Sequence, residues 1–361
     1  MRLVKPAALH PGMTLANSIH DFRGQVVMRE GSSLTESSVR RLVDMRIPLV
    51  AIEDPRFDDL EVFETVSAEV VRELVAFRDA CRQRIVRGRK PSSISLDMGK
   101  CRELAERLVG EVSGAAQEQF NLVQYLPAEQ YWDAHAVNGA ALAVRLARTI
   151  GIEVAAIVEL VIGAITHDLS LCLLPDRVLD NLGRLGPEEK RAFMVHPRLD
   201  AEILRSQGGV SAVTIGSVGQ HHEVWNGTGY PRGLKGTDIL PMARVLCLVD
   251  TYSALVLERP YRQRLMPHEA IEYVMGYAGE LFDMTMAERF ARSIPSYFVG
   301  TSVRMNDGRK GVVVYPNIGE IARPRIRLIT NERGGPLPVP IELNLSSPEN
   351  ASLLISAVVD E

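Results

Sequence analysis

Five histidines and two aspartates in the middle of the chain could together bind metal ions. Of eight histidines in all, five lie within fewer than a hundred residues, namely His135, His167, His196, His221 and His222. Asp168 follows the second of them directly, and Asp250 stands in the run CLVDTYSAL. Imidazoles and carboxylates without a thiolate suit Fe, Mn, Zn, Ni or Co rather than a cysteine-rich structural zinc site. The residue types therefore predict a transition-metal site.

Four of these residues form two pairs of sequence neighbours, which constrains where they can lie. Neighbours on an α-helix point about 100° apart, so His167–Asp168 and His221–His222 are best placed at helix ends, where both side chains reach one site. A single histidine on an apolar helix is more typical of a hydrogen-bonded core residue, but five together favour a site. A carboxylate such as Asp168 can bridge two cations, an arrangement that generates a hydroxide nucleophile and neutralises a phosphate oxyanion.

A glycine-rich segment, HHEVWNGTGYPRGLKG, begins at the second histidine pair and ends at Gly236. Its glycines and Pro231 predict a tightly turned loop. Such a loop is also typical of any helix end, but its position directly after two candidate ligands favours a part in the site.

The candidate ligands fall on or beside helices. Between about 131 and 295 the apolar periodicity predicts a helical bundle with a buried interior, in which such side chains can converge. The predicted helices cover residues 136–150, 153–168, 211–223 and 241–258.

The flanking regions have a different character. Residues 1–55 combine short β-like runs with one helix, LTESSVRRLVDM, whose Thr35 is placed to cap it. Residues 56–130 are charged and helical in period, with a loop at RGRKPSSISLD. Residues 296–361 carry β-branched runs and a hairpin turn at Asn306-Asp307-Gly308. We therefore predict a mainly α protein with a small N-terminal α/β or β-rich module, a helical connector, a helical domain at 131–295 and a short C-terminal β unit.

Composition narrows the class of protein. The 41 basic and 45 acidic residues give a net charge of −4, which does not favour binding to a nucleic acid polymer. The four cysteines form no CxxC pair, which argues against a disulfide framework and a zinc ribbon. No uncharged run reaches the roughly 18 residues of a membrane span. We expect a cytoplasmic protein.

These motifs resemble a known family. His167-Asp168, His196-Pro197, the loop HHEVWNGTGYPRGLKG and the run DTYSALVLERPYR are similar to the HD-GYP branch of the HD phosphohydrolase superfamily, bacterial signalling enzymes that hydrolyse cyclic di-GMP. The similarity runs from about residue 131 to about 290. Residues 1–55 are similar to an uncharacterised module often found ahead of this domain, and family proteins commonly end in a short β tail.

The resemblance implies specific roles. One metal would be held by His135, His167, Asp168 and Asp250, and a second by Asp168, His196, His221 and His222. Asp168 and His167 would thus be central to catalysis, with iron or manganese favoured. Tyr131 stands where some members have a glutamate for a third metal, so the resemblance implies two metals. Arg259 and Arg262 match positions that grip ligand phosphates, while Gly229, Tyr230 and Pro231 shape either the pocket rim or a docking surface for a signalling protein.

The chain departs from the family pattern at three places. The usual HD-x-G-K motif has Leu169, Ser170 and Leu171 in its last three positions, so the lysine near the scissile phosphate is missing. Loss of one such group commonly costs on the order of a hundredfold in rate. Asn226 replaces an aspartate but keeps the turn chemistry, and Ser253 replaces a carboxylate.

The sequence leaves two main classes of function open. The favoured one is a metal-dependent phosphodiesterase that converts cyclic di-GMP to pGpG, with GMP as a further product. The alternative is a catalytically weak receptor that binds cyclic di-GMP or a protein partner through the same pocket. A more distant third possibility is an HD-type phosphohydrolase that acts on another nucleotide. The N-terminal module could sense a signal or pack as the interface of a homodimer. The sequence does not decide the metal, its redox state or the end product.

Overall fold

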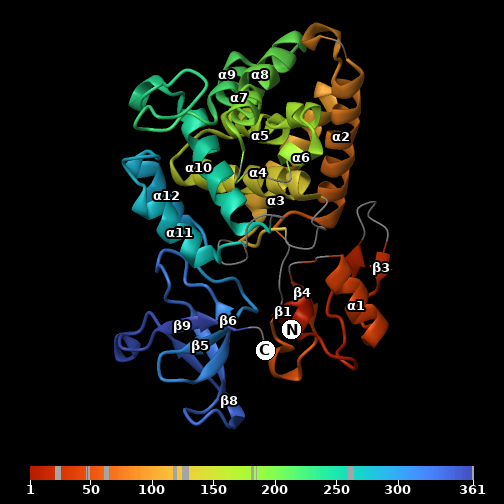
Figure 1. Cartoon of the computed structure of the whole chain (residues 1–361). Coiled ribbons are helices and arrows are strands. Elements are labelled where there is room, and N and C mark those ends of the chain that lie inside the picture. Colours follow the sequence, from red (N-terminus) through yellow and green to blue (C-terminus); the bar gives the residue numbers. More distant parts are fainter. Residues whose placement is uncertain are drawn as a thin grey trace. The chain divides into compact units, whose positions relative to one another are not determined.

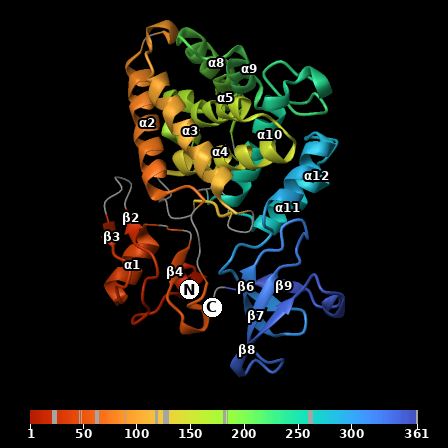
Figure 2. The same ribbon diagram turned by 180° about the vertical axis from the view of Figure 1, so that it is seen from behind.

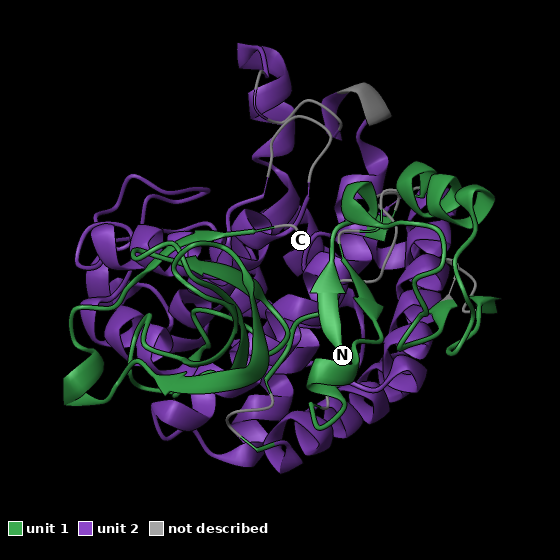
Figure 3. Cartoon of the chain, turned by 90° about the horizontal axis from the view of Figure 1, so that it is seen from below, with its two compact units in different colours: residues 1–64, 116–130, 294–361 green, residues 65–115, 131–293 purple. Residues whose placement is uncertain are grey.

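The computed structural model describes most of the chain. The described residues are 1–20, 26–45, 47, 49–60, 65–88, 90–116, 120–123, 130–179, 183, 185–258 and 264–359. They form two compact units (Figure 3). Unit 1 consists of residues 1–64, 116–130 and 294–361, and unit 2 of residues 65–115 and 131–293.

Unit 2 is the helical part of the chain (Figure 1). Its α-helices are α2 (Ala68–Arg87), α3 (Met98–Gly114), α4 (Tyr131–Thr149), α5 (Val154–Thr166), α6 (Asp176–Leu179), α7 (Pro187–Phe193), α8 (His196–Ser206), α9 (Ala212–Gln220), α10 (Pro241–Val256), α11 (Pro267–Gly276) and α12 (Met284–Ser293). A 3₁₀ turn, η6 (Leu169–Leu173), follows α5. The helices predicted from periodicity are confirmed as α4, α5, α9 and α10.

Helix α4 is buried on all sides and forms the centre of unit 2 (Figure 2). It contacts α2, α3, α5, α10 and α12. Small residues such as Ala140, Ala143 and Ala147 are fully buried along it, which lets neighbouring helices approach closely. The polar residues Asp133 and His135 are buried in it as well. The central position of α4 places its one histidine, His135, in the interior.

One stretch of unit 2, Val154–Leu173, is long and apolar enough to cross a membrane by length and composition alone. In the structure α5 ends at Thr166, and 78% of the most apolar window of this stretch is buried inside the protein. The core helix of a folded domain has the same properties, so this stretch is weak evidence for a membrane span.

Unit 1 contains the β-structure. Its strands are β1 (Arg2–Val4), β2 (Ile19–His20), β3 (Val26–Met28), β4 (Val50–Ile52), β5 (Ser302–Met305), β6 (Lys310–Tyr315), β7 (Arg325–Thr330), β8 (Pro336–Asn344) and β9 (Ile355–Val358). The last five form one antiparallel sheet in the order β8-β7-β6-β5-β9, and β1 pairs with β4. The hairpin predicted at Asn306-Asp307-Gly308 joins β5 and β6, with Gly308 in the left-handed region at φ 90°.

The N-terminal segment and the C-terminal sheet are joined within unit 1. Each has its own apolar core, around Leu42 in the first and Val313 in the second. The guanidinium of Arg327 on β7 makes two 2.6 Å contacts with the Asp59 carboxylate. Leu3 also donates its backbone N–H to the carbonyl oxygen of Gly300 at 3.1 Å. These contacts unite two segments that are almost 300 residues apart in the sequence.

The predicted N-terminal helix is confirmed as α1 (Glu36–Asp44). Thr35 caps it, because its hydroxyl accepts from the backbone N–H of Ser38 at 3.2 Å. The mainly helical architecture with an N-terminal α/β part and a C-terminal antiparallel sheet is also confirmed. The domain boundaries near 55, 130 and 295 stay predictions, although α2 and α3 of the predicted connector belong to unit 2.

Candidate metal centre

All seven predicted metal ligands lie in unit 2 at the ends or inner faces of five helices. His135 is in the first turns of α4, and Asp250 lies on α10. The others occupy helix ends, as the two adjacent pairs require: His167 and Asp168 follow α5, His196 begins α8, and His221 and His222 follow α9. The fold thus brings residues 115 positions apart into one cluster.

Asp168 has the most unusual backbone of the seven. Its φ is 63°, in the left-handed region, where aspartate is tolerated better than most residues with a side chain. This conformation breaks α5 from η6 and turns the carboxylate toward the histidines. The buried carboxylate of Asp200 on α8 holds the turn, because its Oδ1 accepts from the backbone N–H of Ser170 at 2.8 Å.

The first group of ligands is centred on Asp250. Its Oδ1 lies 2.8 Å from Nε2 of His135 and 3.5 Å from Nε2 of His167. The latter nitrogen is also 3.9 Å from Oδ2 of Asp168. One ligand atom from each of these four residues lies within 4.8 Å of the others, which is close enough for one ion.

The second group is centred on the other oxygen of Asp168. Its Oδ1 lies 3.0 Å from Nε2 of His196 and 3.6 Å from Nε2 of His221. These two histidine nitrogens are 3.3 Å apart, and His222 completes the group. Asp168 belongs to both groups, with one oxygen facing each.

Hydrogen bonds to backbone carbonyls orient three of the imidazoles. Nδ1 of His167 donates to the carbonyl oxygen of Ala164 at 2.7 Å. Nδ1 of His196 and Nδ1 of His221 likewise each donate to the carbonyl oxygen of the residue three positions earlier. A carbonyl oxygen only accepts, so Nδ1 carries the proton and the lone pair of the neutral ring sits on Nε2. All three Nε2 atoms point at the shared carboxylate.

This arrangement leaves polar atoms without a hydrogen bond. In the part of the chain that the structure describes, Nε2 of His167 and Oδ1 of Asp168 are buried and make no hydrogen bond. Buried polar groups are normally satisfied. Nitrogen lone pairs and carboxylate oxygens that face one another need a cation or a proton between them. The two groups are therefore consistent with a dinuclear metal site, and their imidazole and carboxylate donors fit a borderline transition ion.

Electrostatics keep both carboxylates charged. Burial opposes the charge on Asp168, but His167 and His196 outweigh it and hold the pKa of this carboxyl well below its usual value. Burial is likewise outweighed at Asp250, whose pKa is held well below its usual value by the close contacts with His135 and His167. Two anionic side chains thus face the interior of the cluster.

The histidines respond to these charges in opposite ways. Burial disfavours the charged imidazolium of His221, yet its contact with Asp168 raises the pKa to about 9. Burial and the neighbouring His221 lower the pKa of His222 well below its usual value. A positive charge is therefore favoured beside Asp168, where a proton or a metal cation can supply it.

Comparison with known proteins agrees with this geometry. A model of the HD domain family matches residues 117–286. A cyclic di-GMP phosphodiesterase from Pseudomonas aeruginosa is 28% identical over 246 residues, which cover 68% of this chain and 59% of that protein. One from Thermotoga maritima is 31% identical over 149 residues, covering 41% of this chain and 40% of that protein. The protein carries an HD domain related to the HD-GYP cyclic di-GMP phosphodiesterases.

Further matches define the limits of this relationship. An HDG"Y"P protein from Bdellovibrio bacteriovorus shares the fold with a TM-score of 0.51 and 18% identity, covering 80% of this chain and 97% of that one. A 3′3′-cGAMP-specific phosphodiesterase from Vibrio cholerae is 32% identical over 141 residues, 39% of this chain and 30% of that protein. The chain spans less than two thirds of the curated relatives named here.

The loop after His222 packs against the candidate metal ligands. The ring of Tyr230 stacks on the imidazole of His222, with centroids 4.7 Å apart. Gly229 permits this approach, because a Cβ there would lie 2.4 Å from the carbonyl oxygen of His222. The carboxylate of Glu223, 1% exposed, accepts the backbone N–H groups of Arg232 and Leu234 at 2.7 and 2.8 Å.

The structure describes Tyr131, Leu171 and Asn226, at which the chain differs from the family pattern. Tyr131 stacks on His135 at 5.6 Å, so an aromatic ring occupies the place of a third-metal ligand. Leu171 is 2% exposed and offers no charge. Asn226 has an amide where the family pattern has a carboxylate, but its side-chain oxygen accepts from the backbone N–H of Thr228 at 3.0 Å and keeps the turn. Arg259 and Arg262 lie outside the described residues.

Ser253 has a role that the sequence did not reveal. Its hydroxyl donates to the carbonyl oxygen of His135 at 3.2 Å and lies 3.1 Å from Nδ1 of the same residue. Because the hydroxyl proton of Ser253 is donated to this carbonyl, the hydroxyl oxygen can only accept a hydrogen bond from Nδ1 of His135. His135 is therefore oriented like the other three ligands, with Nε2 toward a carboxylate.

A buried arginine on α2 supports the HD turn and was also missed. Arg78 is 1% exposed and donates to the carbonyl oxygens of Trp132, Ile165 and His167. Its charge is balanced by Asp133, 3.0 Å away, which also pairs with Arg82. No local pattern marks Arg78 in a helix rich in arginine, whereas Glu223 could have been suspected from its place next to the histidine pair.

Proposed function

We propose that this HD domain is a metal-dependent phosphodiesterase that hydrolyses cyclic di-GMP to linear pGpG, with GMP as a further product. The supporting observation is the pair of His/Asp groups that share Asp168. In this proposal His135, His167 and Asp250 hold the first metal with Asp168, and His196, His221 and His222 hold the second. Iron and manganese are the favoured ions, and a cytoplasmic location is part of the proposal.

The bound cations would supply a hydroxide nucleophile and offset the negative charge that grows on the phosphoryl and leaving oxygens. The side chains of the protein keep this centre in place. Asp168 and Asp250 are held ionised by their histidine neighbours. The imidazoles present their Nε2 atoms because their Nδ1 protons are engaged elsewhere.

The substrate would approach from the side of the cluster that faces solvent. The side chains of His222 and Asp250 are 22% and 14% exposed, whereas the other five ligands are at most 6% exposed. Tyr230 stands beside this opening because it stacks on His222. Arg259 and Arg262 stay proposed phosphate contacts, and Gly229, Tyr230 and Pro231 stay proposed rim residues.

A receptor function is the second candidate. The observation that favours it is Leu171, a buried apolar residue at the place of the lysine that stabilises the scissile phosphate in the family. A pocket that keeps its metals without this cation would bind a cyclic dinucleotide and turn it over slowly. Signalling would then require a protein partner that recognises the occupied state.

One experiment separates these functions. The protein is purified without oxygen, its metal content is measured, and it is incubated with cyclic di-GMP and added Mn(II) or Fe(II). 3′3′-cGAMP serves as the second substrate, because a relative is specific for it. About two metals together with pGpG or GMP would support the enzyme. Two metals and tight binding without product would support the receptor, and absence of both metal and binding would contradict both.

A further inference from the structure

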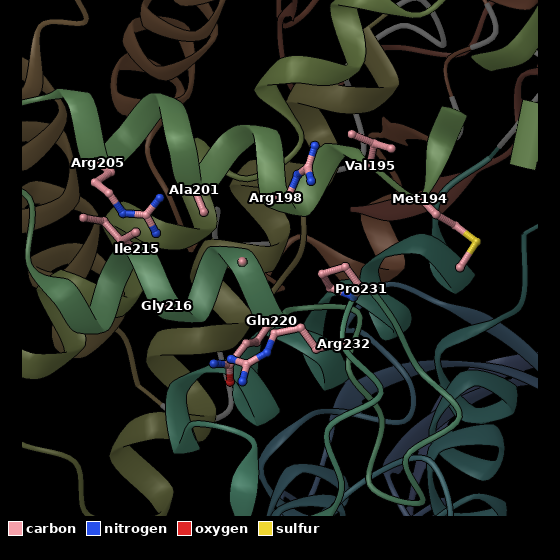
Figure 4. A pocket seen from close by; sticks show the side chains of 11 residues that line it. Met194, Val195, Arg198, Ala201, Arg205, Ile215, Gly216, Gln220, Pro231 and Arg232 are labelled. Carbon is pink, nitrogen blue, oxygen red and sulfur yellow. The ribbon is translucent and has the colours of Figure 1, made fainter. Parts of the chain in front are cut away.

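A pocket lies on the outer side of α8 and α9, the two helices that adjoin His196 and His221. It has a volume of about 420 Å³, within the usual range for small-molecule sites. Its walls come from the segment before α8, from α8 and α9, and from the loop after His222 (Figure 4). We call it the arginine pocket, because three arginines line it: Arg198, Arg205 and Arg232.

The arginine pocket is separate from the metal cluster. On α8, Arg198, Ala201 and Arg205 are spaced by three and four residues and therefore share one face. His196 points about 200° away from Arg198 around the helix, and it is buried with Asp200 on the inner side. A ligand in the pocket would contact the back of the helix that begins with a proposed metal ligand.

Charge in the pocket is of one sign. Arg198 and Arg205 project from α8 and Arg232 from the loop (Figure 4), and the lining contains no acidic residue. Arg198 has an exposed partner, Glu202, at 3.6 Å, a type of pair that contributes little. In the described part of the chain no ion pair forms with Arg205 or Arg232. Two guanidinium groups from different elements are thus available to an anion.

The rest of the lining is apolar. Met194, Val195, Ile215 and Pro231 line the pocket beside the arginines. Val195 is 43% exposed, so part of this apolar surface is open to solvent. A free phosphate would leave this surface in water, whereas a phosphate ester with a flat or apolar group would cover it. Guanidinium groups suit bidentate contact with phosphate.

We propose that the arginine pocket binds a small phosphate ester of nucleotide size, with its phosphate on Arg205 and Arg232 and its apolar part against Met194, Val195 and Pro231. This site does not rest on the proposed catalytic function. Its ligand need not be a substrate, since the proposed metal ligands face the other side of α8 and α9.

The test uses the full chain and calorimetric titration with GMP and with inorganic phosphate at low salt. An Arg205→Gln/Arg232→Gln protein should bind GMP at least tenfold more weakly than the wild type, and Arg205→Glu should bind more weakly still. Arg289→Gln, which removes the same charge from an exposed position on α12, is the matched control and should bind normally. Asp168→Asn, which alters the metal cluster, should leave this binding intact.

Three results would overturn the proposal. The double variant could bind GMP as the wild type does, which would exclude the two arginines. Asp168→Asn could abolish binding, which would place GMP at the metal cluster instead. Inorganic phosphate could bind as tightly as GMP, which would remove any contribution from the apolar wall.

Discussion

The guanidinium of Arg78 donates to the carbonyl oxygen of His167 at 3.3 Å, although α2 precedes the HD pair by almost 90 residues. The same group donates to Ile165, so it satisfies carbonyls at the end of α5 that the helix itself leaves unpaired. A positive charge at a helix C-terminus is also electrostatically favourable. Arg78 therefore supports the turn that presents both residues of the pair.

We expect Arg78→Met to lower the free energy of unfolding by about 3–5 kcal/mol, because the buried carboxylate of Asp133 loses one of its ion-pair partners. Arg78→Lys keeps a charge near Asp133 but loses most carbonyl contacts, so metal affinity should fall about 10- to 100-fold. Metal titration and denaturant unfolding measure the two effects. Wild-type metal affinity in the lysine variant would show that the carbonyl contacts do not matter.

Ser253 should act on the first metal position only. Ser253→Ala leaves Nδ1 of His135 without its acceptor, so we expect a 10- to 100-fold loss of affinity for one of two metals. Ser217→Ala is the control, because the hydroxyl of this buried serine makes no hydrogen bond in the described structure. Loss of both metals in Ser253→Ala, or equal losses in the two variants, would contradict this role.

Asp168 should be needed for both metals. Asp168→Asn keeps the shape and the tolerance for a left-handed backbone but removes the charge, so we expect a folded protein that binds little metal and loses turnover about a hundredfold or more. Asp168→Ala should in addition lose about 1–2 kcal/mol of stability from the strained φ. Hydrolysis of cyclic di-GMP by metal-depleted Asp168→Asn protein would rule out the proposed mechanism.

Leu171→Lys tests the missing cation. We expect turnover per folded, metal-loaded molecule to rise about ten- to a hundredfold, because a charge returns near the phosphate. Stability should fall, since position 171 is 2% exposed and an ammonium there is poorly solvated. Leu171→Met, which conserves volume, controls for packing. Unchanged turnover in Leu171→Lys would show that the lysine is irrelevant in this chain.

The α2–α3 pair should be sensitive to acid. Hydrogen bonds from Lys100 and Arg107 lower the pKa of Glu73 from 4.5 to about 2. A carboxyl with a depressed pKa stabilises the fold above its unfolded pKa and loses this effect as pH falls toward the folded value. The stability difference between wild type and Glu73→Gln should therefore be constant above about pH 5 and shrink below it.

Unfolding curves between pH 7 and pH 2.5 measure this difference. Glu188→Gln on α7 removes the same charge from an exposed position and should show no such decline. A wild-type advantage over Glu73→Gln that persists at pH 2.5 would contradict the assignment.

The sequence by itself determined which residue types form the candidate site and which helices carry them. Apolar periodicity located α4, α5, α9 and α10, and adjacency placed His167, Asp168, His221 and His222 at helix ends, because neighbours within a helix diverge by about 100°. The helix cap at Thr35 and the turn at Gly308 could also be predicted, since both depend on contacts between residues only a few positions apart. These features are local in the chain.

Only the tertiary structure decided how these residues meet. Asp168 has a φ of 63°, which turns its carboxylate toward both groups of ligands, and no pattern of residue types specifies that angle. Ser253 contacts His135 across 118 positions, and Arg78 contacts Asp133 across 55. Such contacts depend on which helix faces pack together. Periodicity gives the apolar face of each helix but not its neighbour, so the orientation of the ligands emerges only when the helices are packed.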